Sequence, residues 1–105
     1  MLSDETVLVV MSEMGRTPQL NGGDGRDHWP YTSVMMVGPK PIGDRVVGAF
    51  DDVHYGVGVD PTTAEVDAGA LVVTPDILGA TLLALADIDP AEEFPGIQPL
   101  TGMFQ

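Results

Sequence analysis

The sequence predicts an α/β fold that combines a few buried strands with one clear helix and an extended tail. Three observations support this prediction. Residues 7–11 form a short apolar run rich in β-branched side chains, apolar residues at helical spacing follow Thr74, and Pro and Gly recur through residues 91–105. The first pattern is typical of a strand, the second of a helix, and the third of a chain segment that continues neither.

The apolar run at residues 7–11 (VLVVM) predicts the first strand. A short, continuous run of this kind is typical of a strand buried on both faces of a sheet that helices cover. In such sheets, ligands bind just beyond the carboxyl ends of the strands. Glu13 and Arg16 follow that end of the run and form a first polar cluster. These polar residues are therefore the first candidates for a site.

A glycine-rich loop at residues 21–25 (NGGDG) leads into a second polar cluster, residues 26–29 (RDHW). Glycine accepts positive φ without steric cost, so this loop can form either a tight hairpin or a flexible segment beside a ligand. Both alternatives allow the second cluster to return to the end of the first strand. We therefore expect the two polar clusters to meet.

The middle of the chain gives weaker signals. Residues 32–38 (TSVMMVG) are apolar, and their spacing fits a short helix or a strand. Residues 45–50 (RVVGAF) predict a further strand, in which Gly48 weakens the pairing or marks a bulge. Residues 60–63 (DPTT) predict a turn with a small exposed hairpin around it.

The clearest helix begins near Thr74, which is a good N-cap, and Pro75 suits the first helical position. We expect Gly79 to mark close packing of this helix on a sheet, and residues 87–90 (DIDP) to end it. The apolar stripe of the predicted helix consists of Ile77, Leu78, Thr81, Leu82, Leu85 and Ile88.

The tail, residues 91–105, is predicted to cross the surface as an extended arm pinned by Phe94 and Phe104. One convincing strand and one convincing helix make a thin core, and a long irregular segment inside a small domain argues against self-sufficiency. We therefore expect the sheet to be completed either by an upstream segment of the same protein or by a homo-oligomer partner.

Composition limits the classes of function. A chain of 105 residues allows a single domain, residues 1–105. Sixteen acidic against four basic residues give a net charge of −12, which argues against binding to nucleic acid or to an anionic membrane. Cysteine is absent, so disulfides and cysteine nucleophiles are excluded. The first residues carry no signal-peptide pattern, which predicts a cytoplasmic protein as the chain stands and an exported one if a longer precursor carries a signal.

Three side chains in the polar clusters have the chemistry of metal ligands: Glu13, Asp27 and His28. Imidazole and carboxylate groups bind zinc or manganese, and carboxylates also bind calcium, so we expect a divalent metal. Adjacent residues of an extended chain point to opposite faces, so Asp27 and His28 can bind the same ion only if the backbone is irregular there. Otherwise Asp27 is expected to orient the His28 ring without contacting the metal itself. The structural alternatives are a solvated glutamate and a hydrogen-bonded packing histidine.

Arg16 and Arg26 are half of the basic residues, and both lie in the polar clusters. The planar guanidinium group binds phosphate or sulfate through two parallel hydrogen bonds, so these arginines are the candidate contacts of a small anionic ester. The structural alternative is an ion pair with Glu13, Asp24 or Asp27.

The motif SEMGRTP at residues 12–18, followed by a glycine-rich spacer and GRDHWPYTS at residues 25–33, resembles the carboxyl-terminal part of the bacterial DUF1501 family. That family is similar to sulfatases and to the wider alkaline-phosphatase superfamily. The resemblance implies that the chain is the carboxyl-terminal part of a larger sulfatase-like domain and a fragment of its three-layer sandwich. It also implies a metal-dependent hydrolase of phosphate or sulfate esters.

The resemblance also assigns roles to individual positions. Relatives in the superfamily carry a strand-end Ser-Asp-His-Gly motif that supplies two metal ligands, and a later histidine that supplies another. Here Ser12-Glu13-Met14-Gly15 occupies the first motif and His28 matches the later histidine. Met14 stands where the relatives have a histidine, which argues against a site with two metals, and their nucleophile lies in upstream segments. Three functions stay open: a portion of a hydrolase, a non-catalytic metal- or anion-binding module, and a structural interaction domain.

Overall fold

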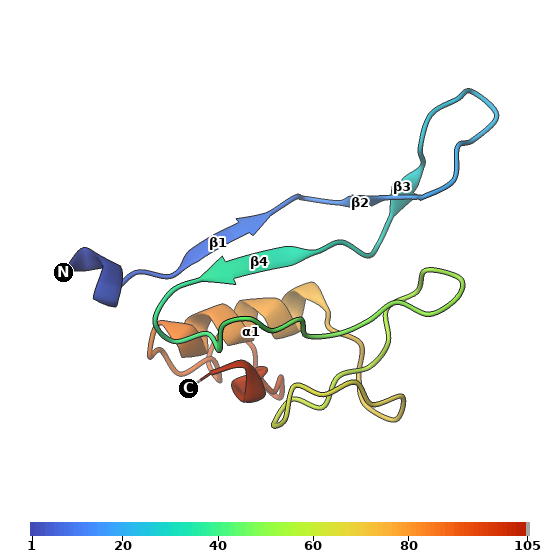
Figure 1. Ribbon diagram of the computed structural model, residues 1–105. Coiled ribbons are helices and arrows are strands. Elements are labelled where there is room, and N and C mark those ends of the chain that lie inside the picture. Colours follow the sequence, from blue (N-terminus) through green and yellow to red (C-terminus); the bar gives the residue numbers. More distant parts are fainter. Residues whose placement is uncertain (105) are drawn as a thin grey trace. The chain divides into compact units, whose positions relative to one another are not determined.

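The computed structural model describes residues 1–104, which divide into two units, Met1–Pro39 and a second unit that begins at Lys40 (Figure 1). In chain order the elements are the 3-10 helix η1 (Leu2–Asp4), the strands β1 (Leu8–Met11), β2 (Gly15–Arg16), β3 (His28–Trp29) and β4 (Val34–Val37), the helix α1 (Pro75–Leu85) and the 3-10 helix η2 (Thr101–Met103). The described residues form a mixed structure of one α-helix and two small antiparallel sheets, and they show no three-layer sandwich.

The first sheet joins β1 to β4 in antiparallel register, from Leu8 opposite Val37 to Met11 opposite Val34. The predicted strand at residues 7–11 is confirmed, and of the two alternatives for residues 32–38 the structure has the strand, as β4. The prediction of burial on both faces is wrong for this structure, because Val10 is 48% exposed and Met11 is 52% exposed. The physical reason is the lack of neighbours: within residues 1–104, β1 has a hydrogen-bonded partner on one edge only.

The second sheet is a hairpin of β2 and β3, with Gly15 opposite Trp29 and Arg16 opposite His28. Of the two alternatives for the glycine-rich loop, the structure has the hairpin. Gly15 is buried, and a Cβ atom at this position would overlap the backbone carbonyl of Tyr31 and lie 3.0 Å from the carbonyl oxygen of Trp29. Only glycine therefore fits at the start of β2.

The second unit contains less regular structure than predicted. Residues 45–50 form no strand, and only Phe50 makes an isolated bridge, to Gly56. Gly48 has a φ of 92°, which an extended strand does not tolerate, so the strand prediction is wrong there. The turn predicted at residues 60–63 is present, and a bridge between Val59 and Val66 closes a small hairpin around it.

Helix α1 confirms the predicted N-terminus. The side chain of Thr74 accepts a hydrogen bond from the backbone N–H of Ile77 at 3.2 Å, and Pro75 is the first helical residue. The helix ends at Leu85, shortly before the predicted stop at residues 87–90. Asp87 has a φ of 60° and takes the left-handed position that often terminates a helix.

The core lies in the second unit, where Val59, Ile77 and Leu100 pack together. Thr81 is fully buried, and its hydroxyl donates to the carbonyl of Ile77 at 2.6 Å and accepts from the N–H of Leu100 at 3.0 Å. The bond from Leu100 fastens the carboxyl-terminal segment to α1, and the bond to Ile77 lies within the helix and orients the hydroxyl.

The tail is fixed by both predicted phenylalanines. The ring of Phe94 lies over Gly79, so this glycine packs closely on an aromatic ring rather than on the predicted sheet. Phe104 forms a bridge with Pro41. Turns and η2 replace most of the predicted extended arm, and Gln105 lies outside the described residues. None of the helices found in residues 1–104 has the length and apolar character required to cross a bilayer.

Candidate functional site

The β2–β3 hairpin brings the two polar clusters together, as the sequence predicts. Arg16 on β2 lies directly opposite His28 on β3. Residues that face each other across an antiparallel pair have Cβ atoms about 4.5–5.5 Å apart and project to the same side of the sheet. Both residues are exposed. The hairpin therefore presents a guanidinium and an imidazole group side by side to solvent.

The two arginines hold the backbone of the hairpin rather than carboxylates. Arg16 donates from Nη1 to the carbonyl oxygen of Arg26 at 3.1 Å, and Arg26 donates from Nη1 to the carbonyl oxygens of Thr17, at 3.0 Å, and Pro18. Neither arginine forms an ion pair within residues 1–104, so the predicted structural alternative is not what this part of the chain adopts. Arg26 is turned into its own loop, whereas Arg16 remains on the strand beside His28.

Backbone and side-chain contacts extend the hairpin by one residue pair beyond β2 and β3. The N–H of Thr17 donates to the carbonyl of Asp27 at 3.0 Å, and the N–H of Asp27 donates to the hydroxyl of Thr17 at 3.2 Å. The base of the loop is thus paired immediately next to Arg16 and His28.

Asn21 organises the rest of the loop, and sequence reasoning did not single it out. Its side-chain oxygen accepts from the N–H groups of Gly23 at 2.9 Å and Gly25 at 3.0 Å, and its side-chain N–H donates to Oδ1 of Asp27 at 2.9 Å. The signal was present, because asparagine followed by glycines is the pattern of a turn that closes on its own backbone.

The predicted metal ligands are only partly brought together. His28 lies on β3, Asp27 precedes it with one carboxylate oxygen engaged by Asn21, and Glu13 lies before β2 with its carboxylate accepting from the hydroxyl of Ser12 at 3.4 Å. Their donor types suit a divalent metal. Within the described range, however, no three His, Cys, Asp or Glu side chains are grouped so that they can hold a metal ion. These residues fit part of a metal site at most.

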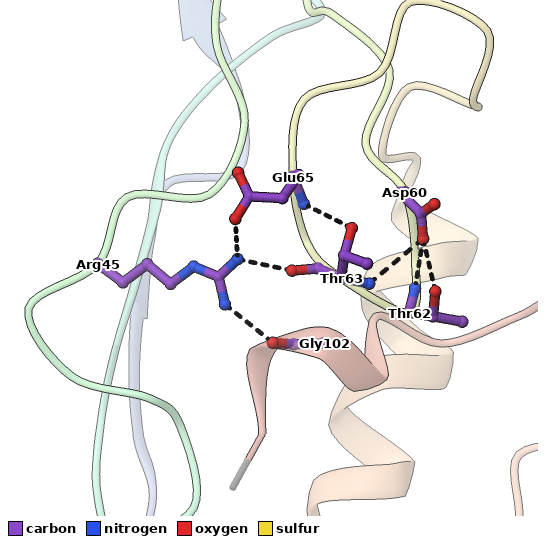
Figure 2. Close-up of polar contacts among 6 residues, drawn as sticks. All are labelled: Arg45, Asp60, Thr62, Thr63, Glu65 and Gly102. Atoms are coloured by element: carbon purple, nitrogen blue, oxygen red, sulfur yellow. Dashed lines mark hydrogen bonds and ion pairs between the residues drawn. The ribbon is translucent and has the colours of Figure 1, made fainter.

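In the second unit, a separate group of polar contacts surrounds Arg45 (Figure 2). Its guanidinium donates to the carbonyl oxygens of Gly102 at 3.0 Å and Thr63 at 2.6 Å, and pairs with Glu65 at 3.2 Å. Sequence reasoning placed Arg45 in a strand and missed this role. The contacts connect three separate stretches of the chain, so they serve the fold rather than a ligand.

Asp60 closes the adjacent turn (Figure 2). One of its carboxylate oxygens accepts from the hydroxyl and the N–H of Thr62, both at 2.8 Å, and from the N–H of Thr63 at 3.3 Å. The hydroxyl of Thr62, followed by the two backbone N–H groups, lowers the pKa of Asp60 below its ordinary value of 3.8.

Comparison with known proteins settles the family. The model of a family described as "Protein of unknown function (DUF1501)" matches residues 1–100. The chain belongs to the DUF1501 family. The match extends from the two motifs through α1 and confirms the resemblance drawn from SEMGRTP and GRDHWPYTS. No curated protein and no solved structure gives a match to this DUF1501 chain.

Proposed function

We propose that this DUF1501 chain is the carboxyl-terminal portion of a sulfatase-like, metal-dependent hydrolase of phosphate or sulfate esters. The observation that carries the proposal is the register of the β2–β3 hairpin, which sets Arg16 opposite His28. Arg16 belongs to the motif at residues 12–18 and His28 to the motif at residues 25–33, the two motifs on which the resemblance to the family rests. Both residues are exposed on the hairpin.

Each side chain supplies a distinct part of the chemistry. Arg16 keeps guanidinium N–H groups beyond the one bonded to Arg26, and these suit the oxygens of a phosphate or sulfate group. His28 and Glu13 would hold a divalent metal, with Asp27 in support. A bound metal would polarise the ester and neutralise the charge that develops in the transition state. Arg26 is bonded to its own loop, so its part is to shape the site.

A complete site requires residues from outside the hairpin, because Glu13, Asp27 and His28 do not form a closed metal cage. The β1–β4 sheet supports completion by another segment. Leu8, Val10, Met35 and Val37 occupy one face of it by register, and all are between 48% and 56% exposed. Exposed apolar faces and unpaired strand edges in soluble proteins are typically covered. We propose that an upstream segment of the same protein, or a second copy, covers this face and builds the sandwich.

A non-catalytic metal- or anion-binding module is the second candidate function. It is favoured by Met14, which replaces the histidine of the superfamily motif and cannot serve as a ligand of a hard cation. In this alternative the hairpin binds an anion or a metal without turnover. A purely structural interaction domain would bind a partner through the apolar face and would bind neither an anion nor a metal.

Calorimetric titration of the chain with zinc and with manganese tests the proposal. We expect binding that both His28→Ala and Glu13→Gln weaken. His54→Asn is the matched control, because it removes the other histidine and asparagine tolerates the φ of 66° at that position. Binding that neither substitution weakens would overturn the site. Binding by the complete protein without hydrolysis of a phosphate or sulfate ester would favour the second candidate.

A further inference from the structure

The pairing that sets Arg16 opposite His28 is short. The ladder of β2 and β3 contains two residue pairs, and residues 17–27 connect the strands. A two-stranded hairpin is marginally stable by itself, and the register of a hairpin depends on its connection. The geometry of the pair therefore depends on how the loop is closed.

The side chain of Asn21 closes the loop at both of its levels. At the tip, its oxygen accepts from the N–H groups of Gly23 and Gly25, while the backbone N–H of Asn21 donates to the carbonyl of Gly25 at 2.7 Å. At the base, its side-chain N–H reaches Oδ1 of Asp27 at 2.9 Å. Asp27 immediately precedes His28, so the tip of the loop is connected to the start of β3.

We propose that Asn21 is a positioning residue for the Arg16–His28 pair, and that it acts through Asp27. The inference rests on the proposed function, in which Arg16 contacts the anion and His28 holds the metal beside it. By fixing Asp27 beside Thr17, the amide of Asn21 keeps β3 in the register that holds His28 opposite Arg16. Asp27 then serves chiefly as an acceptor within the loop.

The position requires the chemistry of an amide. The oxygen of Asn21 accepts two hydrogen bonds and its nitrogen donates one to a carboxylate. Aspartate keeps the acceptors but has no side-chain donor at neutral pH, and it would set a second negative charge against Asp27. Alanine removes all three bonds. The substitutions at this position are therefore predicted to differ in a defined way.

The test is an exchange of the two side chains in the full chain. Asn21→Asp removes the donor, whereas Asp27→Asn keeps an acceptor for Asn21. The double variant N21D/D27N restores one hydrogen bond in the opposite direction, from the new amide to the new carboxylate. Gly22→Ala is the control in the same loop, because an added Cβ there meets nothing within 4 Å.

Two readouts are followed: NMR contacts between Arg16 and His28 across the hairpin, and the affinity for inorganic phosphate. We expect Asn21→Asp to lose the cross-strand contacts and to weaken phosphate binding about tenfold. A tenfold change in affinity corresponds to the free energy that one typical hydrogen bond contributes. Asp27→Asn and the exchanged double variant should retain the cross-strand contacts, because each keeps a hydrogen bond between positions 21 and 27.

The alternatives are separated by the outcome. Cross-strand contacts and phosphate affinity unchanged in Asn21→Asp would overturn the inference. A loss of the cross-strand contacts in Asp27→Asn that equals their loss in Asn21→Asp would also overturn it, because it would mean that the charge of Asp27 itself holds the register. Absence of phosphate binding in the unaltered chain would count against the proposed function. The NMR contacts between Arg16 and His28 would still test the role of Asn21, because they do not depend on phosphate.

Discussion

Substitution of Gly15 by alanine is the sharpest perturbation of the hairpin. Gly15 is buried at the start of β2, and its added Cβ would overlap the carbonyl oxygen of Tyr31, with the carbonyl carbon of that residue at 2.9 Å and the carbonyl oxygen of Trp29 at 3.0 Å. All three neighbours are backbone atoms, so no rotation of a side chain relieves the overlap.

The magnitude follows from the size of the hairpin. An overpacked methyl group typically costs about 1–3 kcal/mol, and each backbone hydrogen bond contributes about 1 kcal/mol. Because the ladder holds only two residue pairs, separating the strands costs about as much as retaining the overlap. We therefore expect Gly15→Ala to open the hairpin in a large share of the molecules and to weaken the pairing of Arg16 with His28.

NMR contacts between β2 and β3 are the assay, with far-ultraviolet circular dichroism as a check on α1. Gly22→Ala is the matched control, since its added Cβ meets no atom within 4 Å. The helix signal should stay unchanged in both variants, because the core around Ile77 lies in the second unit. Cross-strand contacts that keep their full strength in Gly15→Ala would refute the reasoning.

Two further predictions concern the second unit. Thr81→Val should lower the free energy of unfolding by about 1–3 kcal/mol, because the buried N–H of Leu100 loses its acceptor, whereas Thr81→Ser should recover most of the loss in urea unfolding. Asp60 has a lowered pKa, so its stabilising contribution is fully present above its ordinary value of 3.8 and is lost as the pH falls through the lower folded-state value. Asp60→Asn should therefore flatten the acid limb of the stability profile, and an unchanged acid limb would contradict the role of its hydrogen bonds to Thr62.

Local signals were sufficient for α1. Thr74 and Pro75 mark the start of the helix, and the structure has the expected capping hydrogen bond to Ile77. Such signals depend on residues within one turn, so a sequence records them directly. The predicted end of α1 was less exact, because Asp87 terminates the helix in a left-handed conformation that is usual for glycine.

Burial was harder to predict than strand position. The run at residues 7–11 contains a strand, but whether its side chains are buried depends on neighbouring segments that the run does not specify. The apparent strand at residues 45–50 failed for the opposite reason, since Gly48 takes a positive φ that local apolar character does not reveal. Arg45 and Leu100 likewise act through partners distant in sequence.

The meeting of the two polar clusters was predictable from the sequence, whereas their detailed geometry was less so. The two motifs correctly predicted that the clusters meet, and the structure adds that Arg16 lies opposite His28. They did not show that Arg26 would bind its own loop or that Asn21 would hold Asp27, because these contacts depend on the path of the loop. The roles of Glu13, Asp27 and His28 as metal ligands remain predictions.

The central claim is that Arg16 and His28 belong to one site, in which Arg16 contacts the anion and His28 holds the metal beside it. A double-mutant cycle on phosphate affinity in the presence of zinc, with Arg16→Gln, His28→Ala and the double variant, measures this directly. Side chains that share a ligand are expected to show a coupling energy of about 0.5–3 kcal/mol. Losses that add to within about 0.5 kcal/mol would contradict a shared site on the hairpin.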